Sequence, residues 1–383
     1  MKRVCIVVAS RANYSSIKSV MRAVKAHPDL ELQLVVGASA LLDRYGAVVR
    51  LIEKDGFAPA AKINMLIEGE TPVTMAKSTG LGLLELPTVL ENLAPDVVVT
   101  VGDRFETMAT ALAAAYMNVP LAHTMGGEVS GTIDESIRHA ITKLAHLHFP
   151  ASSDARERII RLGEDPATVH RVGCPRIDLI AEILQSEAMV VPGNLFEGGV
   201  GDKIGLSEPF LLVSQHPVTT EYGQGEKQIT ETLQAVHDVG MQAVVLWPNA
   251  DAGSDDVARG IRKWREAGLA KNMHFFKNLP IDVYVRLMRQ TVCLVGNSSS
   301  GLRDGAFIGT PSVNIGTRQA GRERGHNVID VGNDRTEIEQ AIRRQIAHGH
   351  YQSDAVYGDG QAGVRIADII ATSDISVQKR ITY

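Results

Sequence analysis

Short apolar runs alternate with longer amphipathic segments along the whole chain. Runs of about four to eight apolar residues, bounded by glycine, proline or small polar residues, are typical of strands buried in a parallel sheet. In the first half they predict strands at residues 4–8, 30–36, 96–101, 146–149 and 170–172, and one that ends at residue 123. Helices are predicted at 43–55, 72–93 and 152–162, together with one of about a dozen residues that Ser15 caps.

The second half repeats this order. Its apolar runs predict strands at residues 210–214, 242–246, 273–276, 292–295 and 312–315, and a final helix at 363–372. This alternation predicts an α/β fold of two Rossmann-type, doubly wound parallel sheets with the active site in a cleft between them. We expect the domains at residues 1–185 and 209–365. The glycine-rich segment 186–208 is the expected connection, and residues 366–383 are expected to pack back on the first domain.

Composition narrows the class of protein. With 383 residues, of which 44% are hydrophobic and 22% charged, the chain fits two globular domains. The formal net charge of −5 excludes long-range attraction to nucleic acid or to an anionic membrane. No run of about 18 apolar residues indicates a membrane span, and the first apolar run is too short for a signal peptide. Three scattered cysteines indicate a reducing compartment, so we expect a cytoplasmic protein.

Titratable side chains concentrate where two consecutive strands of the first half end. The stretch DVVVTVGDRFETMATALAAAYMNVPLAHTMGGEVSGTIDESIRH, residues 96–139, contains strand, helix, strand and a glycine-rich acidic turn before the next helix. Parallel strands bring their carboxyl ends to one edge of the sheet, where ligands bind in open α/β folds. The residues expected to form the sugar-reacting half of an active site are Asp103, Arg104, Glu106, His123, Glu128, Asp134, Arg138 and His139.

The second half offers a different chemistry. GNSSSG follows the strand at 292–295 and opens a helix, so its N–H groups and hydroxyls suit a phosphate, helped by the helix dipole. A capped helix start is the simpler alternative, since neither a Walker motif nor the Rossmann glycine spacing is present. In the loop GTRQAGRERG, Arg318 or Arg322 suits bidentate phosphate contact. Asp304, one helical turn after Ser300, suits the ribose hydroxyls or is a surface charge.

Other polar residues also lie at strand tips. A single histidine at such a position is usually structural, but His123 and His216 at two tips together favour a functional role. Arg11, after the first strand, can meet a pyrophosphate. The spacing of the histidines between residues 139 and 148 matches neither HExxH nor a Cys/His cluster, so no metal site is predicted.

The motifs together resemble a known enzyme family. They are SRANYS, GDRFET, GGEVSGTIDESIRHAITKLAH, QHPVTTE, WPNADAG, GNSSSGLRDGAFIGTPSVNIGTRQ and GRERG. This combination is similar to the hydrolysing UDP-N-acetylglucosamine 2-epimerases of sialic acid biosynthesis and their relatives, from the first strand to about Asn327. The resemblance implies a GT-B-like fold and conversion of UDP-N-acetylglucosamine and water to N-acetylmannosamine and UDP. It also implies that no cofactor or metal is needed and that the chain forms a homodimer or homotetramer.

The implied reaction explains the residue types. The C2 proton of an N-acetylhexosamine is not next to a carbonyl carbon, so UDP must leave C1 while a base removes that proton. Water then adds to the resulting glycal and leaves C2 inverted. The resemblance implies that Asp103 and Asp134 are catalytic acids and bases and that His216 lies near the leaving diphosphate. Substrate or UDP contacts are expected from Arg11, Ser15, Arg104, His123, Arg138, Asn249, Ser298, Ser299, Asp304 and Arg318.

The chain departs from the family pattern at two positions. Met125 lies where many members have a catalytic glutamate, in HIEGGE, so Glu128 or Asp134 takes that role or the sugar presents an apolar group there. Asp304 replaces the usual glutamate at the ribose contact. A sugar with a 6-methyl group and a 4-acetamido group would suit the less polar pocket that Met125 creates. UDP-2,4-diacetamido-2,4,6-trideoxyglucose, a precursor of legionaminic acid, is therefore the alternative substrate.

Three further functions stay open. A non-hydrolysing epimerase would return UDP-N-acetylmannosamine without free UDP, and a GT-B glycosyltransferase would release UDP only with an acceptor present. A catalytically dead nucleotide-sugar-binding protein would bind UDP without turnover.

Overall fold

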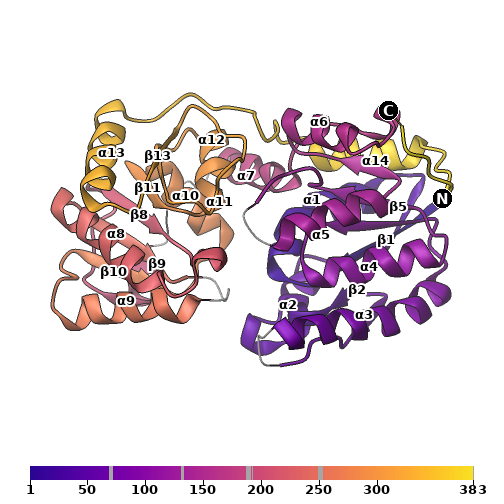
Figure 1. Ribbon diagram of the computed structural model, residues 1–383, viewed down its shortest axis with the longest axis horizontal. Coiled ribbons are helices and arrows are strands. Elements are labelled where there is room, and N and C mark those ends of the chain that lie inside the picture. The colour runs from indigo at the N-terminus through magenta and orange to yellow at the C-terminus, as the bar shows by residue number, and fades with distance from the viewer. Residues whose placement is uncertain (69–71, 131–132, 187–190, 192, 249–252, 383) are drawn as a thin grey trace. The chain divides into compact units, whose positions relative to one another are not determined.

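The structure is a computed structural model of the chain. It describes all residues except 69–71, 131–132, 187–190, 192, 249–252 and 383 (Figure 1). Contacts divide the chain into two compact units. The first contains Met1–Val129, Ile133–Leu179 and Gly358–Tyr383, and the second consists mainly of Ile180–Tyr357. One crossing between the units lies inside a helix, and the chain returns to the first unit at Gly358, eight residues before the expected position 366.

The first unit is built on a six-stranded parallel sheet in the order β3-β2-β1-β4-β5-β6. Its strands are β1 (Lys2–Val8), β2 (Leu30–Gly37), β3 (Ala61–Ile63), β4 (Val97–Val101), β5 (Leu121–Thr124) and β6 (Leu147–Phe149). All five residues of β4 are buried, as expected for a parallel sheet with helices on both faces. The order is that of a Rossmann sheet and reverses between β1 and β4, the position where ligands bind in such folds.

Alternate residues of β1 face two different cores. Val4, Ile6 and Val8 join one apolar cluster, which includes residues of α1 and α14, whereas Cys5 and Val7 join the cluster on the other face. The helices of this unit are α1 (Arg11–Ala26), α2 (Val48–Lys54), α3 (Pro72–Leu93), α4 (Phe105–Tyr116), α5 (Ile133–Leu144), α6 (Ser153–Arg161), α7 (Pro175–Gln185) and α14 (Ala362–Thr372). α7 is the helix that contains the crossing to the second unit.

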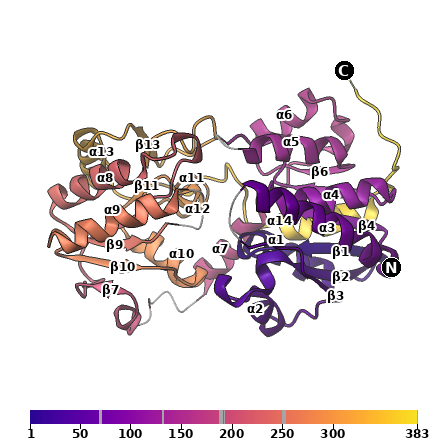
Figure 2. The ribbon, with the colours of Figure 1, turned by 60° about the horizontal axis from the view of Figure 1, so that its bottom comes forward.

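The C-terminal helix α14 packs beside α1 (Figures 1 and 2). Its Ile366 and Ile370 are fully buried in the first cluster. The backbone N–H groups of Ala362 and Gly363 donate to the two carboxylate oxygens of Asp178, at 3.0 and 2.7 Å. Lys2 Nζ donates to Ile370 O at 2.7 Å, so both ends of α14 are tied to the first unit.

The second unit contains a seven-stranded sheet in the order β13-β12-β11-β8-β9-β10-β7. Its strands are β7 (Val200–Gly201), β8 (Phe210–Ser214), β9 (Gln242–Leu246), β10 (Met273–Phe276), β11 (Cys293–Gly296), β12 (Ser312–Ile315) and β13 (Val328–Val331). All pairs are parallel except the short β7, which pairs antiparallel with β10. This is the same Rossmann order with one added edge strand, and it reverses between β8 and β11.

The helices of the second unit differ in length. They are α8 (Gly225–Val239), α9 (Ser254–Glu266), α10 (Ile281–Gln290), α11 (Ser299–Leu302), α12 (Asp304–Ile308) and α13 (Arg335–His348). Short 3-10 turns occur in both units at Ala38–Leu41, Asp43–Tyr45, Pro166–Thr168, Leu195–Glu197 and Thr219–Glu221.

The structure corrects several expected elements. Residues 170–172 form no strand, and only an isolated bridge joins His148 to Val169. The helix expected at 43–55 begins at Val48, because Ala47 has a left-handed backbone (φ 38°) that separates it from the turn before it. The strands β3, β7 and β13 were not expected. β3 and β7 have only three and two residues, and β13 has no buried residue because Asp330 interrupts its apolar run.

Candidate functional site

The carboxyl end of β4 carries a carboxylate that is paired with a buried arginine. Gly102 has φ +73°, which turns the chain so that Asp103 follows the strand and Arg104 precedes α4. The Asp103 carboxylate accepts from Arg138 Nη2, and the Arg138 side chain is only 2% exposed. Arg138 Nη1 also donates to Glu128 O at 2.6 Å. One buried guanidinium thus holds Asp103 and the glycine-rich turn after β5 in a fixed arrangement.

His123, on β5, holds the turn that precedes Asp103. Its side chain is fully buried, and its Nε2 lies 2.7 Å from Gly102 O. Burial lowers the pKa of His123 to about 4, so the imidazole is neutral and donates to that carbonyl. We expected His123 to contact the substrate. Its complete burial argues against direct contact and for a role in positioning Gly102 and Asp103.

Two more carboxyl groups lie near Asp103. Glu106, in the first turn of α4, has a side chain 1% exposed and accepts from Arg104 Nε at 3.2 Å. Burial raises the pKa of Glu106; the Arg104 charge opposes this shift and the nearby negative charge of Asp134 adds to it. Asp134, half-buried in the first turn of α5, is therefore an electrostatic neighbour of Glu106. We call Asp103, Arg104, Glu106, Asp134 and Arg138 the carboxylate region.

The glycine-rich turn after β5 tolerates no side chain at its centre. Gly127 has φ +76°, and a Cβ there would collide with Ala155 O. Arg158 Nη1 donates to Gly127 O at 2.5 Å, which fixes the turn from α6. Glu128 is 5% exposed at the end of this turn. Met125 has a left-handed backbone (φ 61°). Its partly buried side chain packs against the apolar cluster that lies between the sheet and the helices α1 and α14.

The end of β1 differs from what we expected. The N-cap of α1 is Ser10, whose hydroxyl accepts from Asn13 N at 3.2 Å, so the expectation that Ser15 caps this helix was wrong. Ser15 lies one turn into α1 and accepts from Arg176 Nη1 at 3.3 Å. Arg11, the first residue of the helix, is exposed.

The carboxyl ends of β8 and β11 are joined by amide hydrogen bonds. His216 N donates to Asn297 Oδ1 at 2.7 Å, and Asn297 Nδ2 donates to His216 O at 2.8 Å. Asn297 O accepts from Arg318 Nη1 at 3.3 Å and from Gln319 Nε2 at 2.9 Å. Burial, followed by the Arg318 charge, lowers the pKa of His216 to about 3. His216 is therefore a neutral hydrogen-bonding group and not a cation.

The serine turn follows Asn297 directly. Ser298 caps α11 by accepting from Ser300 N at 3.4 Å, and Ser298 and Ser299 are both half-buried. α11 spans only Ser299–Leu302, so the helix dipole that we expected to assist a phosphate is weak. We call His216, Asn297, Ser298, Ser299, Ser300 and Arg318 the serine region.

Asp304 is not one turn further along the same helix. Arg303 (ψ −71°) interrupts the helix, and Asp304 begins α12 with 0% of its surface exposed. Contact with a ribose would require its carboxylate to become accessible. Asn249, also expected to contact UDP, lies outside the described residues.

Sequence reasoning missed several residues that hold these regions. Arg158 donates to Gly127 in the turn after β5, and Arg176 donates to Ser15. No local sequence pattern distinguishes these two arginines from others. Gln319 and Arg324 could have been found, because they lie in the same polar loop as Arg318. Arg324 Nη2 donates to Gln319 O at 3.0 Å, which fixes that loop.

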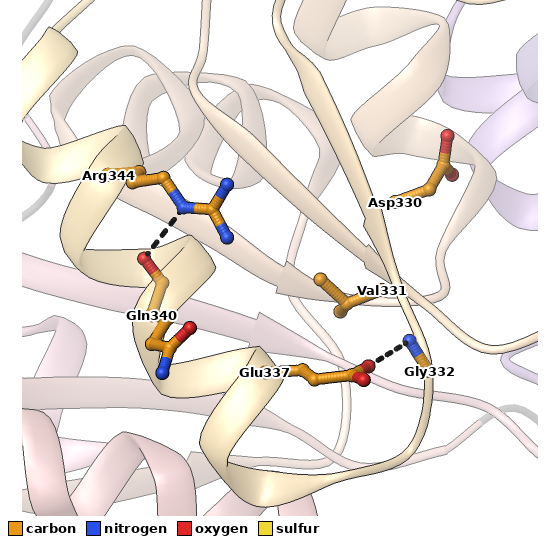
Figure 3. Close-up of a pocket in the computed structure, with 6 residues that line it drawn as sticks. All are labelled: Asp330, Val331, Gly332, Glu337, Gln340 and Arg344. Carbon is orange, nitrogen blue, oxygen red and sulfur yellow. Dashed lines mark hydrogen bonds between the residues drawn. The ribbon is translucent and has the colours of Figure 1, made fainter.

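A separate surface depression of about 450 Å³ lies beside β13 and α13 (Figure 3). Its lining residues are Asp330, Val331, Gly332, Glu337, Gln340 and Arg344. Glu337 Oε2 accepts from Gly332 N at 3.2 Å across its floor. None of the residues in the carboxylate or serine regions lines it, so we base the candidate site on side-chain chemistry and not on this depression.

The described residues contain neither a cluster of metal ligands nor a membrane-spanning helix. No three His, Cys, Asp or Glu side chains gather there as metal ligands would. Within the same part of the chain, no helix combines the length and apolarity needed to cross a membrane.

Comparison with known proteins assigns the chain to a family. A family model described as UDP-N-acetylglucosamine 2-epimerase matches residues 22–371. The chain belongs to the UDP-N-acetylglucosamine 2-epimerase family. Members similar to this chain include enzymes named as hydrolysing, which confirms the resemblance stated from the motifs.

Curated relatives cover nearly the whole chain. The UDP-N,N'-diacetylbacillosamine 2-epimerase (hydrolyzing) of Legionella pneumophila is 32% identical over 378 residues, which is 99% of this chain and 98% of that protein. The UDP-N-acetylglucosamine 2-epimerase of Neisseria meningitidis serogroup B is 29% identical over 387 residues, with the same coverage of 99% and 98%.

A solved structure settles the fold class. The crystal structure of a UDP-GlcNAc 2-epimerase from Neisseria meningitidis bound to UDP-GlcNAc matches with a TM-score of 0.81 at 17% sequence identity. The match covers 97% of this chain and 100% of that one. Together with the two parallel sheets, this confirms the expected GT-B-like fold with two Rossmann-type domains.

Proposed function

We propose that this family member is a hydrolysing 2-epimerase that converts UDP-N-acetylglucosamine and water to N-acetylmannosamine and UDP. The carboxylate region carries the proposal. Asp103 is held by the buried Arg138, and a second acid, Asp134, lies electrostatically close to the buried Glu106. Epimerisation at C2 needs carboxyl groups that remove and return a proton, and such groups work best when their positions and protonation are set in advance.

The proposed reaction has two steps. In the first, the carboxylate of Asp103 or Asp134 takes the C2 proton while the C1–O bond breaks, and the electron pair of that bond leaves with UDP. A glycal remains. In the second, a carboxyl group returns a proton to C2 on the opposite face while a water oxygen bonds to C1 and gives its extra proton to a carboxylate. Glu128 is the further candidate for one of these proton transfers.

The serine region is proposed to hold the diphosphate. Arg318 supplies a positive charge, and Ser298 and Ser299 supply hydroxyl donors. A neutral His216 can donate one hydrogen bond to the leaving phosphate oxygen. We extend the proposed UDP contacts to Arg11, Ser15, Arg104, Asn249 and Asp304, as the family resemblance implies. For Asp304 this requires its buried carboxylate to become accessible when UDP binds.

A second substrate is favoured by a specific observation. Met125 packs against the core and presents no carboxylate in the place where many relatives carry a glutamate. UDP-2,4-diacetamido-2,4,6-trideoxyglucose has a 6-methyl group that suits a less polar neighbour, and the Legionella relative is named for this diacetylbacillosamine sugar.

Product analysis tests the proposal. The pure protein is incubated with each nucleotide sugar in deuterated water, and the sugar is identified by NMR. We expect free N-acetylmannosamine with deuterium at C2, together with UDP. Free product only from the diacetamido sugar would support the second substrate. UDP-N-acetylmannosamine without free UDP would show a non-hydrolysing epimerase, and no product from either sugar would overturn the proposal.

We further propose a cytoplasmic homodimer or homotetramer. Cys5, Cys174 and Cys293 are all buried, and an odd number of cysteines scattered along the chain suits a reducing compartment. Light scattering on the purified protein would give the oligomeric state, and a monomeric mass would contradict this part of the proposal.

A further inference from the structure

Three hydroxyl groups form a chain that leads from the interior to the serine turn. Tyr284, on α10, is 8% exposed, and its Oη lies 2.6 Å from Ser300 Oγ. Ser300 Oγ lies 2.8 Å from Ser298 Oγ. Ser300 is also 8% exposed, whereas Ser298 is only half-buried. The chain therefore begins in the core of the second unit and ends at a hydroxyl that a ligand can reach.

The three hydroxyls can donate in more than one arrangement, because each has one proton and two lone pairs. In the outward direction Tyr284 donates to Ser300 and Ser300 to Ser298. In the inward direction Ser298 donates to Ser300, which either donates to Tyr284 or accepts from it as well. In the outward direction, Ser298 Oγ accepts from Ser300 Oγ and from Ser300 N, at 2.8 and 3.4 Å. The proton of Ser298 is then directed away from the chain. In the inward direction, Ser298 donates to Ser300 and offers an incoming anion only lone pairs.

We propose that Tyr284 is a positioning residue for anion binding, because its phenol donates to Ser300 and so directs the Ser298 proton toward the diphosphate of the substrate. A phenol is a stronger donor than an aliphatic alcohol, which favours the outward direction. Hydrogen bonds in a chain polarise one another, so an anion at Ser298 strengthens the same direction. This inference rests on the proposed function, since it assigns the diphosphate to the serine region.

The substitution Tyr284→Phe tests the role of the phenol. Phenylalanine keeps the ring in its buried position and removes only the donor, so Ser298 loses its enforced direction. We expect the Kd for UDP to rise about three- to tenfold, the effect of one hydrogen bond. The KM for the nucleotide sugar should rise by a similar factor with kcat changed less than about twofold, because substrate and transition state both retain the phosphate.

Tyr351→Phe is the matched control. The Tyr351 hydroxyl donates to Gln345 Oε1 at 2.8 Å in the same unit and is not a member of the hydroxyl chain. The control removes the same atom type and should leave UDP binding unchanged. Ser300→Ala interrupts the middle of the chain and should weaken UDP binding at least as much as Tyr284→Phe. Adding Tyr284→Phe to Ser300→Ala should then have little further effect.

Calorimetry with UDP and with uridine separates the outcomes. We expect Tyr284→Phe to lose affinity for UDP but not for uridine, which has no phosphate. Unchanged UDP affinity, or an equal loss for both ligands, would overturn it, as would an equal loss in Tyr351→Phe. If the unaltered protein binds no UDP, the proposed function fails as well. If it binds and hydrolyses the nucleotide sugar but Tyr284→Phe behaves like the parent protein, only this inference fails.

Discussion

The two candidate regions sit at equivalent places in two similar sheets but are built from opposite chemistry. In the first unit, the strand ends carry paired charges, such as the half-buried Asp103 with the buried Arg138. In the second unit, the strand ends are joined by neutral amides and hydroxyls, such as Asn297 with His216. Both sheets reverse their strand order at these ends, between β1 and β4 and between β8 and β11.

The difference follows from what each region is proposed to do. Moving a proton requires carboxyl groups whose charge can change, and their partners must hold them through that change. Binding a diphosphate requires donors that do not titrate near neutral pH, and a His216 with a pKa of about 3 meets this condition. Under this proposal, the same fold supports proton transfer in one unit and anion binding in the other.

Asp103→Asn should separate the two regions most clearly. The variant keeps the shape of the side chain but removes the charge, so we expect kcat to fall by about a hundred- to ten-thousandfold. UDP affinity, measured by calorimetry, should stay within about twofold of the parent protein. Asp134→Asn is the companion variant and should also lose turnover. Full activity in both variants would show that the carboxylate region is not catalytic.

Removing a buried charge should cost more stability than removing an exposed one. Arg138→Met leaves Asp103 without its buried partner, and we expect a loss of about 3–5 kcal/mol in the free energy of unfolding. Arg343→Met is the control in the second unit, where the pair with Glu339 has side chains 52% and 29% exposed. Its loss should stay below about 1 kcal/mol. Urea denaturation measures both, and equal losses would contradict the contrast between the regions.

Arg318 is the charged group of the serine region, and its removal should lower the affinity for UDP. Arg318→Gln should weaken UDP binding by about tenfold or more, the effect of a charge-assisted hydrogen bond. The pKa of His216 should rise only in part, since burial lowers it more than the Arg318 charge does. Calorimetry and NMR titration measure the two effects. Arg322→Gln, in the same loop, is the control, and a larger loss there would reassign the phosphate contact.

The buried Glu164 of the first unit predicts that the stability of the protein depends on pH. Glu164 accepts from Lys143 Nζ at 2.5 Å, Lys379 Nζ at 2.7 Å and His148 Nε2 at 3.1 Å. Burial by itself would raise the pKa of Glu164, but these hydrogen bonds from His148, Lys143 and Lys379 lower it to about 2. A lowered pKa stabilises the fold above the ordinary value of 4.5, and the stabilisation is lost as the pH falls toward 2.

Glu164→Gln should therefore unfold at a lower temperature at pH 7, by a few degrees. The difference from the parent protein should shrink as the pH falls from about 4.5 toward 2. Glu157→Gln is the control, because the pair of Glu157 with Arg161 has side chains 62% and 81% exposed. Calorimetric scans at several pH values test this, and a difference independent of pH would refute the assignment.

Much of the fold followed from local pattern. The strand at 210–214 and the helix at 72–93 have the bounds that the sequence predicted. The strand is buried at all five residues and therefore shows as a continuous apolar run, whereas a helix shows an apolar period of 3.6 residues. The errors were of two kinds. Ser15 was expected to cap α1, although Ser10 offers the same hydroxyl five residues earlier. The edge strand β13 was missed because Asp330 interrupts its apolar run and none of its four residues is buried.

The candidate residues were found because charged and small polar groups follow buried strands, and their positions along the chain mark the edge where the strands end. Their partners could not be found in that way. Arg138 reaches Asp103 only because β5 lies beside β4, and Tyr284 reaches Ser300 only because α10 packs near the end of β11.

Apolar periodicity is a property of residues that are close in the sequence, so the sequence alone determines it. Hydrogen bonds and ion pairs between distant residues depend on which strands become neighbours, and only the folded arrangement of the sheets decides that.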